Sequence, residues 1–180
     1  MPELQPPDLR TDAIVLRPWR LEDLDELVAE LQDPEIPRWT RIPQPYGRDD
    51  GREFLERSAE GWRAGTSANF AVVDAADGRL LGSLGAIFQQ EDAATLGYWV
   101  ARGARGRGIA SDALRLVSRW LLESFPIERV ELVTAPENVA SQRVAEKAGF
   151  TREGLLRRYV EIKGKRRDCV MFSLMPDDLR

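Results

Sequence analysis

Two patterns of hydrophobic and polar residues alternate along most of this chain. Short apolar runs rich in β-branched residues predict strands, and apolar residues spaced three and four apart predict helices. The predicted strands cover residues 13–19, 70–74, 79–88, 95–100, 130–134, 155–162 and 169–174. The predicted helices cover residues 21–31, a segment from a cap at Asp49 or Asp50 to Gly65, 110–123 and 138–148. Residues 33–46 combine prolines with aromatic residues and predict an ordered loop.

Turn residues separate these elements and indicate the domain organisation. The segment Ala-Ala-Asp-Gly at 75–78 predicts a hairpin turn, and Gly149 predicts a left-handed helix end. No repeat or long linker divides the 180 residues, and 43% of them are hydrophobic, which suffices for one core. The sequence therefore predicts a single α/β domain over residues 1–180, with residues 1–12 as a flexible or extended N-terminal segment.

Cysteine and histidine content narrows the possible chemistry. The chain has one cysteine, Cys169, and no histidine. An internal disulfide is therefore excluded, and zinc sites, Ser-His-Asp triads and Cys-His dyads are disfavoured. No apolar run approaches the about 20 residues that cross a bilayer, and the N-terminus lacks the pattern of a signal peptide. These features favour a soluble cytoplasmic protein without a membrane partner.

Charge is unevenly distributed along the chain. The net charge is −4, yet residues 101–170 hold 15 Lys and Arg against 9 Asp and Glu. A nucleic-acid binder is usually basic overall, whereas this basic region is local and the pI is about 5.1. A compact phosphorylated ligand therefore fits better than a nucleic acid. The acidic excess of the remaining residues favours a cationic acceptor through its field.

The most distinctive segment is Arg-Gly-Ala-Arg-Gly-Arg-Gly-Ile-Ala at 102–110, between a predicted strand and a predicted helix. Its three glycines permit tight turns that expose backbone N–H groups, and its three arginines add positive charge. The first N–H groups of a helix lack internal partners and carry the positive end of its dipole, so they bind anions. An ordinary solvated turn has a similar composition, and the neighbouring segments decide between the two.

Three segments together carry a family resemblance. They are Gly-Tyr-Trp-Val at 97–100, Arg-Gly-Arg-Gly-Ile-Ala at 105–110, and Asn-Val-Ala-Ser at 138–141 with Glu-Lys-Ala-Gly-Phe at 146–150. The chain resembles the GNAT N-acyltransferases from residue 14 to residue 174, in particular the RimJ/RimL-like branch, which includes ribosomal-protein N-terminal acetyltransferases. The resemblance implies a mixed, mostly antiparallel sheet of about seven strands, flanked by helices and splayed between the fourth and fifth strands.

The resemblance also implies acetyl-CoA as the cosubstrate and no metal. In the family, pantetheine pairs with the edge of the strand before the glycine-rich turn, and the turn's N–H groups hold the pyrophosphate. Arginine side chains there add charge-assisted contacts to phosphates. The cofactor-site residues implied in this chain are Trp99, Val100, Ala101, Arg102, Arg105, Gly106, Arg107, Gly108, Ile109, Ala110, Asn138 and Ser141.

The reaction implied is direct transfer, in which a neutral amine attacks the thioester and the thiolate leaves. A backbone N–H near Val100 would polarise the carbonyl. Many family members have a tyrosine four residues after the position of Ser141 that protonates the thiolate, but this chain has Ala145 there. Ser141 is therefore the candidate proton donor. Without histidine the base is a carboxylate, a tyrosine or a water chain, and Glu91 is the best candidate. The others are Asp92, Tyr159 and Glu161.

The acceptor is less well determined than the donor. A protein N-terminal α-amine is favoured, since about 10 to 15% of it is neutral at pH 7, against about 0.04% of a lysine side chain. Trp39, Tyr46 and Tyr98 are candidates to line the acceptor site, although aromatic residues more often belong to a core.

Other hypotheses stay open at this point. The acceptor can instead be a small-molecule amine, such as a polyamine, an antibiotic or an amino-acid derivative. The chain can also be a non-catalytic acyl-CoA-binding module or carry a nucleic-acid-binding loop. A covalent acyl-enzyme on Cys169 is disfavoured, because no histidine is present to activate the thiol. A homodimer is neither indicated nor excluded.

Overall fold

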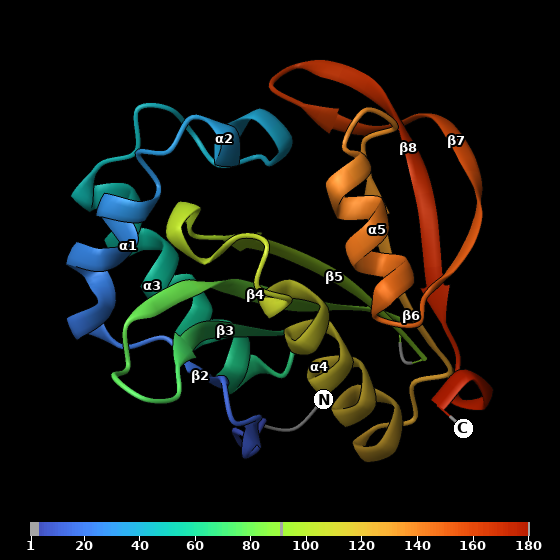
Figure 1. Cartoon of the computed structure of the whole chain (residues 1–180), viewed down its shortest axis with the longest axis horizontal. Helices are drawn as coiled ribbons and strands as arrows, with labels where there is room; N and C mark the ends of the chain where they lie inside the picture. Colours follow the sequence, from blue (N-terminus) through green and yellow to red (C-terminus); the bar gives the residue numbers. More distant parts are fainter. Residues whose placement is uncertain (1–3, 91, 180) are drawn as a thin grey trace.

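An open sheet of eight strands organises the residues that the structure describes, 4–90 and 92–179 (Figure 1). The structure is a computed structural model. The strand order is β1-β2-β3-β4-β5-β6-β8-β7, and the neighbouring strands are antiparallel except for the parallel pair β5 and β6. The strands are β1 (Leu9–Arg10), β2 (Ile14–Pro18), β3 (Ser67–Asp74), β4 (Leu80–Gln90), β5 (Ala93–Val100), β6 (Arg129–Thr134), β7 (Thr151–Ile162) and β8 (Lys165–Leu174).

Five α-helices and three short 3-10 segments accompany the strands in the described ranges. The helices are α1 (Leu24–Glu30), α2 (Glu35–Trp39), α3 (Arg48–Ala64), α4 (Ile109–Ser124) and α5 (Val139–Lys147). The 3-10 segments are η1 (Leu21–Asp23), η2 (Arg102–Ala104) and η3 (Pro176–Leu179). None of the helices in the described ranges is long and apolar enough to cross a membrane.

This architecture confirms the predicted mixed, mostly antiparallel sheet and its splay between the fourth and fifth predicted strands. The additional strand is β1, whose two residues pair with β2 through Leu9↔Leu16 and Arg10↔Val15. So short a strand has no hydrophobic period from which to predict it. Upstream of β1, Leu4 is buried and its N–H donates to the carbonyl of Trp62 at 3.0 Å.

The prediction of a loop over residues 33–46 was wrong at its centre, where α2 lies. The Asp33 side chain accepts the N–H of Glu35 at 3.1 Å, and Ile36 is buried in a small core with residues of α1 and α3. Proline residues near a single helical turn obscure the helical period, so this element has a weak signal. The first predicted helix is also divided, into η1 and α1.

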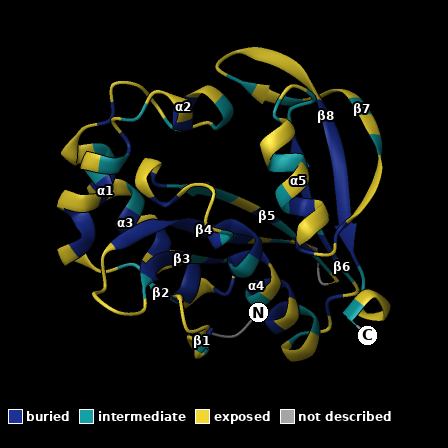
Figure 2. Ribbon diagram, viewed as in Figure 1, coloured by how far each residue is buried: buried dark blue, intermediate teal, exposed yellow. Residues whose placement is uncertain are grey.

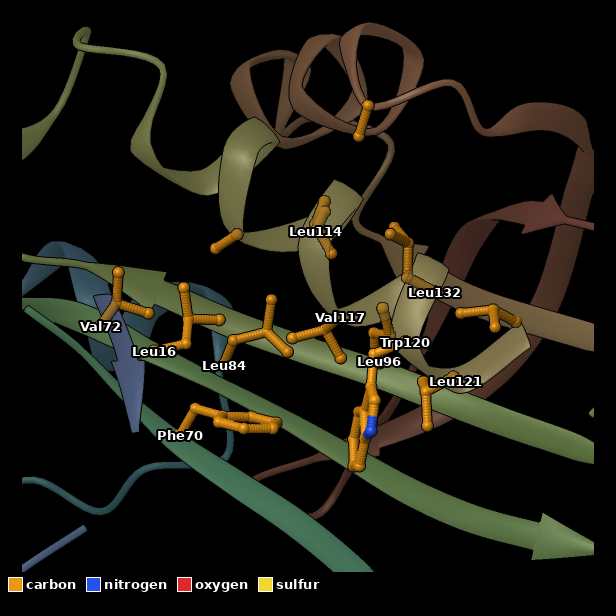
Figure 3. Close-up of a cluster of buried hydrophobic side chains, with 14 of the residues drawn as sticks. Leu16, Phe70, Val72, Leu84, Leu96, Leu114, Val117, Trp120, Leu121 and Leu132 are labelled. Atoms are coloured by element: carbon orange, nitrogen blue, oxygen red, sulfur yellow. The ribbon is translucent and has the colours of Figure 1, made fainter. Parts of the chain in front are cut away.

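The main core lies between the sheet and α4. The predicted apolar stripe of α4 is buried, and Leu114, Val117 and Leu121 lie toward the strands that carry Phe70 and Leu84 (Figure 3). An aromatic group closes one end of this core, with the ring of Phe70 5.1 Å from that of Trp62 and 5.6 Å from that of Trp120. Figure 2 shows the buried strands, including most of β8, against an exposed outer surface of α4, an exposed β7 and an exposed tip of the β7–β8 hairpin.

An ion-pair network ties the edge strand β7 to β6 across β8. Both terminal nitrogens of Arg129 donate to the carboxylate of Glu153, at 2.7 and 2.8 Å. Ser173 donates its hydroxyl to the same carboxylate at 2.6 Å, and the Nε of Arg129 donates to Glu131 at 3.0 Å. The Arg129 bonds, followed by the Ser173 bond, lower the pKa of Glu153 to about 2.

We predict that Glu153→Gln lowers the melting temperature at about pH 6 and that its difference from the parent disappears in acid. The folded pKa of Glu153 is below its usual 4.5, so its stabilisation is complete above pH 4.5 and is lost as the pH falls through about 2. Circular-dichroism melts between about pH 6 and pH 2 measure this. Glu60→Gln, in an exposed pair with Arg63, is the control and has little effect. A difference for Glu153→Gln that does not change with pH would contradict the assignment.

Candidate functional site

The turn between β5 and α4 has open space beside its backbone. Gly106 and Gly108 have φ angles of 76° and 83°, which residues with a Cβ rarely adopt. A Cβ at Gly106 would meet no atom within 4 Å. A Cβ at Gly108 would meet only Asp112 Oδ2 at 3.9 Å and Lys147 Nζ at 4.0 Å. The glycines therefore give the turn its shape and leave room for a ligand against its backbone.

Helix α4 begins directly after this turn. Gly108 is its N-cap residue, and no side chain caps the helix. The N–H groups of Ile109, Ala110 and Ser111 are in the first turn, where an α-helix has no internal partners for them. They also carry the positive end of the helix dipole. The turn and the helix start together suit an anion such as a phosphate group.

Cationic side chains surround the turn but differ in their availability. Arg105 pairs with Asp33, with 2.6 Å between Nη2 and Oδ2, and its Nε donates to the carbonyl of Val100 at 3.2 Å. Arg107 lies 3.6 Å from Asp74. Within the described ranges, Arg102 forms no ion pair. To contact an anion at the turn, Arg105 and Arg107 would have to leave their carboxylates, whereas Arg102 has no such pair to break.

Strands β5 and β6 separate beside this turn. They pair only over Ala93–Thr95 and Arg129–Glu131, while β5 continues along β4 as far as Val100. The main chain of residues 96–100 therefore has a partner on one edge only. A Cβ at Gly97 would meet nothing within 4 Å, so the face of the strand to which it would point is open as well. An extended ligand can pair with this edge as an added strand would.

A hydrogen bond joins β5 to α5 across the split. The hydroxyl oxygens of Tyr98 and Ser141 are 2.8 Å apart. Asn138 is the N-cap residue of α5, and its side-chain oxygen accepts the N–H of Ser141 at 3.1 Å. Burial raises the pKa of Tyr98, an effect that the Ser141 bond partly offsets. The phenol is therefore protonated at neutral pH and can donate to Ser141. Ala145, at the expected tyrosine position, is fully buried.

The aromatic residues predicted for the acceptor side lie in different surroundings. Trp39 ends α2 and is partly exposed, with the guanidinium of Arg38 4.6 Å from its ring centroid. Tyr46 is 7% exposed and belongs to the small core between α1, α2 and α3. Burial is the main cause that raises the pKa of Tyr46 to about 12. Tyr98 lies at the split, as described above.

The predicted bases are not gathered into one place. Glu91 lies outside the described residues. Asp92 is exposed, and its carbonyl accepts the N–H groups of Glu128 and Arg129. Tyr159 and Glu161 are exposed on β7. None of these observations gives any of the four a catalytic contact.

Cys169 is buried in β8. Burial is the main cause that raises the pKa of its thiol, so little thiolate is present at neutral pH. This agrees with the expectation that the cysteine is not a nucleophile.

Comparison with known proteins identifies the family to which the chain belongs. The sequence model of the acetyltransferase (GNAT) domain family matches residues 13–151. The chain belongs to this GNAT family. It is therefore an N-acetyltransferase of this family, as the resemblance implied. The chain is 30% identical over 169 residues to the uncharacterized N-acetyltransferase p20 of Bacillus licheniformis, covering 93% of this chain and 95% of that protein.

Two further GNAT proteins are similar to the chain. It is 30% identical over 83 residues to the [ribosomal protein uS5]-alanine N-acetyltransferase of Escherichia coli, covering 46% of this chain and 43% of that protein. It also matches the solved structure of Mycobacterium smegmatis RimJ in complex with CoA-disulfide, with a TM-score of 0.84 and 26% identity. That match covers 98% of this chain and 88% of RimJ.

Sequence reasoning missed two features of this GNAT site. One is the contact of Tyr98 with Ser141, since Tyr98 was predicted to line the acceptor site. The other is Lys147, whose Nζ lies near Gly108 from the far end of α5. Lys147 is part of the Glu-Lys-Ala-Gly segment that supported the resemblance, so a signal for it was present.

We predict that Asn138→Ala lowers the free energy of unfolding by about 1 kcal/mol, because α5 loses its N-cap. Urea denaturation followed by circular dichroism measures the change. Asn138→Asp is the matched control, since its carboxylate accepts the same N–H and should retain most of the stability. Equal losses in both variants would mean that the capping bond is not the cause.

Proposed function

We propose that this GNAT domain is an acetyl-CoA-dependent N-acetyltransferase that transfers an acetyl group directly to a primary amine, specifically a protein N-terminal α-amine. The observation that carries the proposal is the free edge of β5 beside the glycine turn at the start of α4. A free strand edge that is followed by an anion site suits a ligand with an extended amide arm and a pyrophosphate.

The residues present fit acetyl-CoA. The open space at Gly106 and Gly108 leaves the turn and the first N–H groups of α4 accessible to a pyrophosphate. Arg102 and Lys147 add positive charge at the turn, and Trp99, Val100 and Ala101 supply the main chain for the amide arm. When bound, acetyl-CoA supplies an activated acetyl group and a thiolate leaving group.

Ser141 is the proposed proton donor to the leaving sulfur, with Tyr98 positioning it. Tyr98 holds the Ser141 hydroxyl from β5 at 2.8 Å, and its phenol stays protonated at neutral pH. As Ser141 gives its proton to the thiolate, it takes the phenol proton of Tyr98 along this hydrogen bond, and Tyr98 regains a proton from solvent before the next turnover. The pair thus takes the part of the tyrosine that Ala145 replaces.

The amine must lose a proton as it is acetylated. Glu91, which lies outside the described residues, remains the proposed base, and Trp39 and Tyr46 remain proposed acceptor-side residues. An α-amine is easier for the base to deprotonate than a lysine side chain, whose pKa is about 2.5 higher. The similarity to the [ribosomal protein uS5]-alanine N-acetyltransferase of Escherichia coli also supports a protein N-terminus as acceptor.

We predict that acetyl-CoA raises the melting temperature of the parent protein and that Gly106→Ala abolishes this rise. A hundredfold excess of ligand over its Kd stabilises by about 2.7 kcal/mol. The added methyl group would occupy the space beside the turn where the pyrophosphate binds.

Gly78→Ala is the matched control for this substitution. Gly78 has a φ of 77° and nothing within 4 Å of an added Cβ, as at Gly106, but it lies in the β3–β4 turn. Both variants carry the same backbone strain, and only Gly78→Ala should keep the acetyl-CoA shift. A parent protein whose melting curve does not move, or a retained shift in folded Gly106→Ala, would refute the proposed cofactor site.

We predict that Tyr98→Phe lowers kcat about tenfold and leaves the KM for acetyl-CoA unchanged. The ring is kept, but Ser141 loses the partner that orients and reprotonates it; general acid catalysis is typically worth about 100-fold or more. Thiol release with a fixed amine measures both constants. An unchanged kcat would show that the hydrogen bond between Tyr98 and Ser141 has a structural role and no catalytic one.

Thermal-shift, thiol-release and nucleic-acid-binding measurements together separate the other functions. A non-catalytic acyl-CoA-binding module would show the thermal shift without thiol release with any amine. A small-molecule acetyltransferase would act on polyamines or aminoglycosides in preference to peptides. A nucleic-acid binder would show salt-dependent binding to DNA or RNA that CoA does not affect.

A further inference from the structure

A basic hollow lies between α2 and the tip of the β7–β8 hairpin. Figure 1 shows α2 and this hairpin tip at the same end of the molecule. The hollow has a volume of about 400 Å³. Its lining residues are Pro37, Arg38, Ile162, Lys163, Lys165 and Arg167. Four of these carry a positive charge and none carries a negative one.

Two hydrogen bonds join the walls of the hollow and leave its positive charge without a negative partner. Lys163 donates its ammonium to the carbonyl of Pro37 at 2.9 Å. Arg41, which follows α2, donates Nε to the carbonyl of Glu161 at 3.2 Å. Each cation thus bonds to a neutral carbonyl and keeps its charge for other partners.

The remaining cations are only partly neutralised. Arg38 pairs with Glu35 at 3.2 Å on the exposed surface. Lys165 and Arg167, two apart on β8, project from one face of the strand. In the part of the chain that the structure describes, neither side chain has a hydrogen bond or an ion pair. The neighbouring Asp168 is engaged elsewhere, because its carboxylate accepts the N–H of Arg158 at 2.7 Å.

The hollow adjoins the site through β8 and α5. Three residues after Arg167 on β8, Val170 pairs with Thr134, the last residue of β6, and Glu137 follows in the short connection from β6 to α5. Glu137 directly precedes Asn138, the N-cap of α5, whose first turn holds Ser141. The hollow is therefore at the end of α5 where Ser141 meets Tyr98, on the side of α2 and Trp39.

We propose that this hollow binds acidic side chains that follow the acceptor's N-terminal amine, so that the acceptor is a protein with an acidic N-terminus. This inference rests on the proposed acetyltransferase function. Several cations spread over two elements suit several carboxylates of an extended peptide. A compact phosphate would be held better by converging N–H groups, and the five-residue α2 provides no such site.

The charge of the whole chain makes this local field selective. The net charge of −4 repels an acidic partner in general, whereas the hollow attracts one at this position. The attraction acts at an exposed surface, so it weakens as salt is added.

The test compares peptides that share a first residue but continue with acidic, amide or basic residues. We expect the acidic peptide to have a KM about tenfold below that of the amide peptide, and the basic peptide to be the poorest. The double variant Lys165→Gln/Arg167→Gln should lose this preference, with each exposed ion pair contributing a factor of up to about five. The kcat for a saturating amide peptide should be unchanged.

The control variant is Arg63→Gln/Arg119→Gln, which removes the same charge from exposed helix surfaces. It should keep the preference for acidic peptides, and melting curves check that both variants are folded. Equal KM values for the three peptides, or a preference that survives in the Lys165/Arg167 variant, would overturn the proposal. A preference for phosphoethanolamine over the acidic peptide, lost in the same variant, would overturn it in favour of a compact phosphate.

A separate measurement keeps this inference distinct from the proposed function. If acetyl-CoA gives no thermal shift and no amine releases thiol, the proposed function fails. Fluorescence anisotropy with labelled acidic and amide peptides then tests the hollow directly. Tighter binding of the acidic peptide that the Lys165/Arg167 variant loses supports the hollow, and equal binding of both peptides refutes it.

Discussion

The pairing of β5 with β6 ends after three residues, and the rest of the site depends on this split. An interior strand normally has partners on both edges, because unpaired backbone groups away from water are costly. Beyond Thr95, β5 keeps β4 as its partner while β6 continues along β8. The main-chain groups on the open edge are thus available to whatever enters the split.

One helix packs on the strands at both sides of the split. Helix α4 packs on β4, β5 and β6 through Leu114, Val117 and Leu121, so both sides of the split rest on one rigid element. The hydrogen bond from Tyr98 to Ser141 spans the gap from β5 to α5. Because α4 starts at the end of the same strand, its unpaired N–H groups come to the mouth of the split. The path of the chain from β5 to α4 therefore suffices to place the anion site next to the free strand edge.

Most of the fold was predictable from the sequence because its elements are long enough to show a period. The stripe of α4 and the apolar runs of β3 and β4 are strong signals, whereas α2 has one turn and β1 two residues. In the site, the glycine turn was predictable because its residues are contiguous. The contact of Tyr98 with Ser141 joins residues 43 apart, and it follows only from the topology. The basic hollow joins Pro37 to Lys163, 126 residues apart, so whole-chain charge could not indicate it.

The two ends of the site both carry positive charge, but they present it differently. At the start of α4 the charge is partly that of fixed N–H groups, whose directions suit one compact anion. At the hollow it belongs to long side chains such as Lys165 and Arg167, which adapt to their partner and recognise charge more than shape. Two negatively charged ligands can therefore be directed to different places by the arrangement of the positive groups at each. A phosphate gains most where N–H groups converge, and a flexible acidic segment gains most where several separate cations are available.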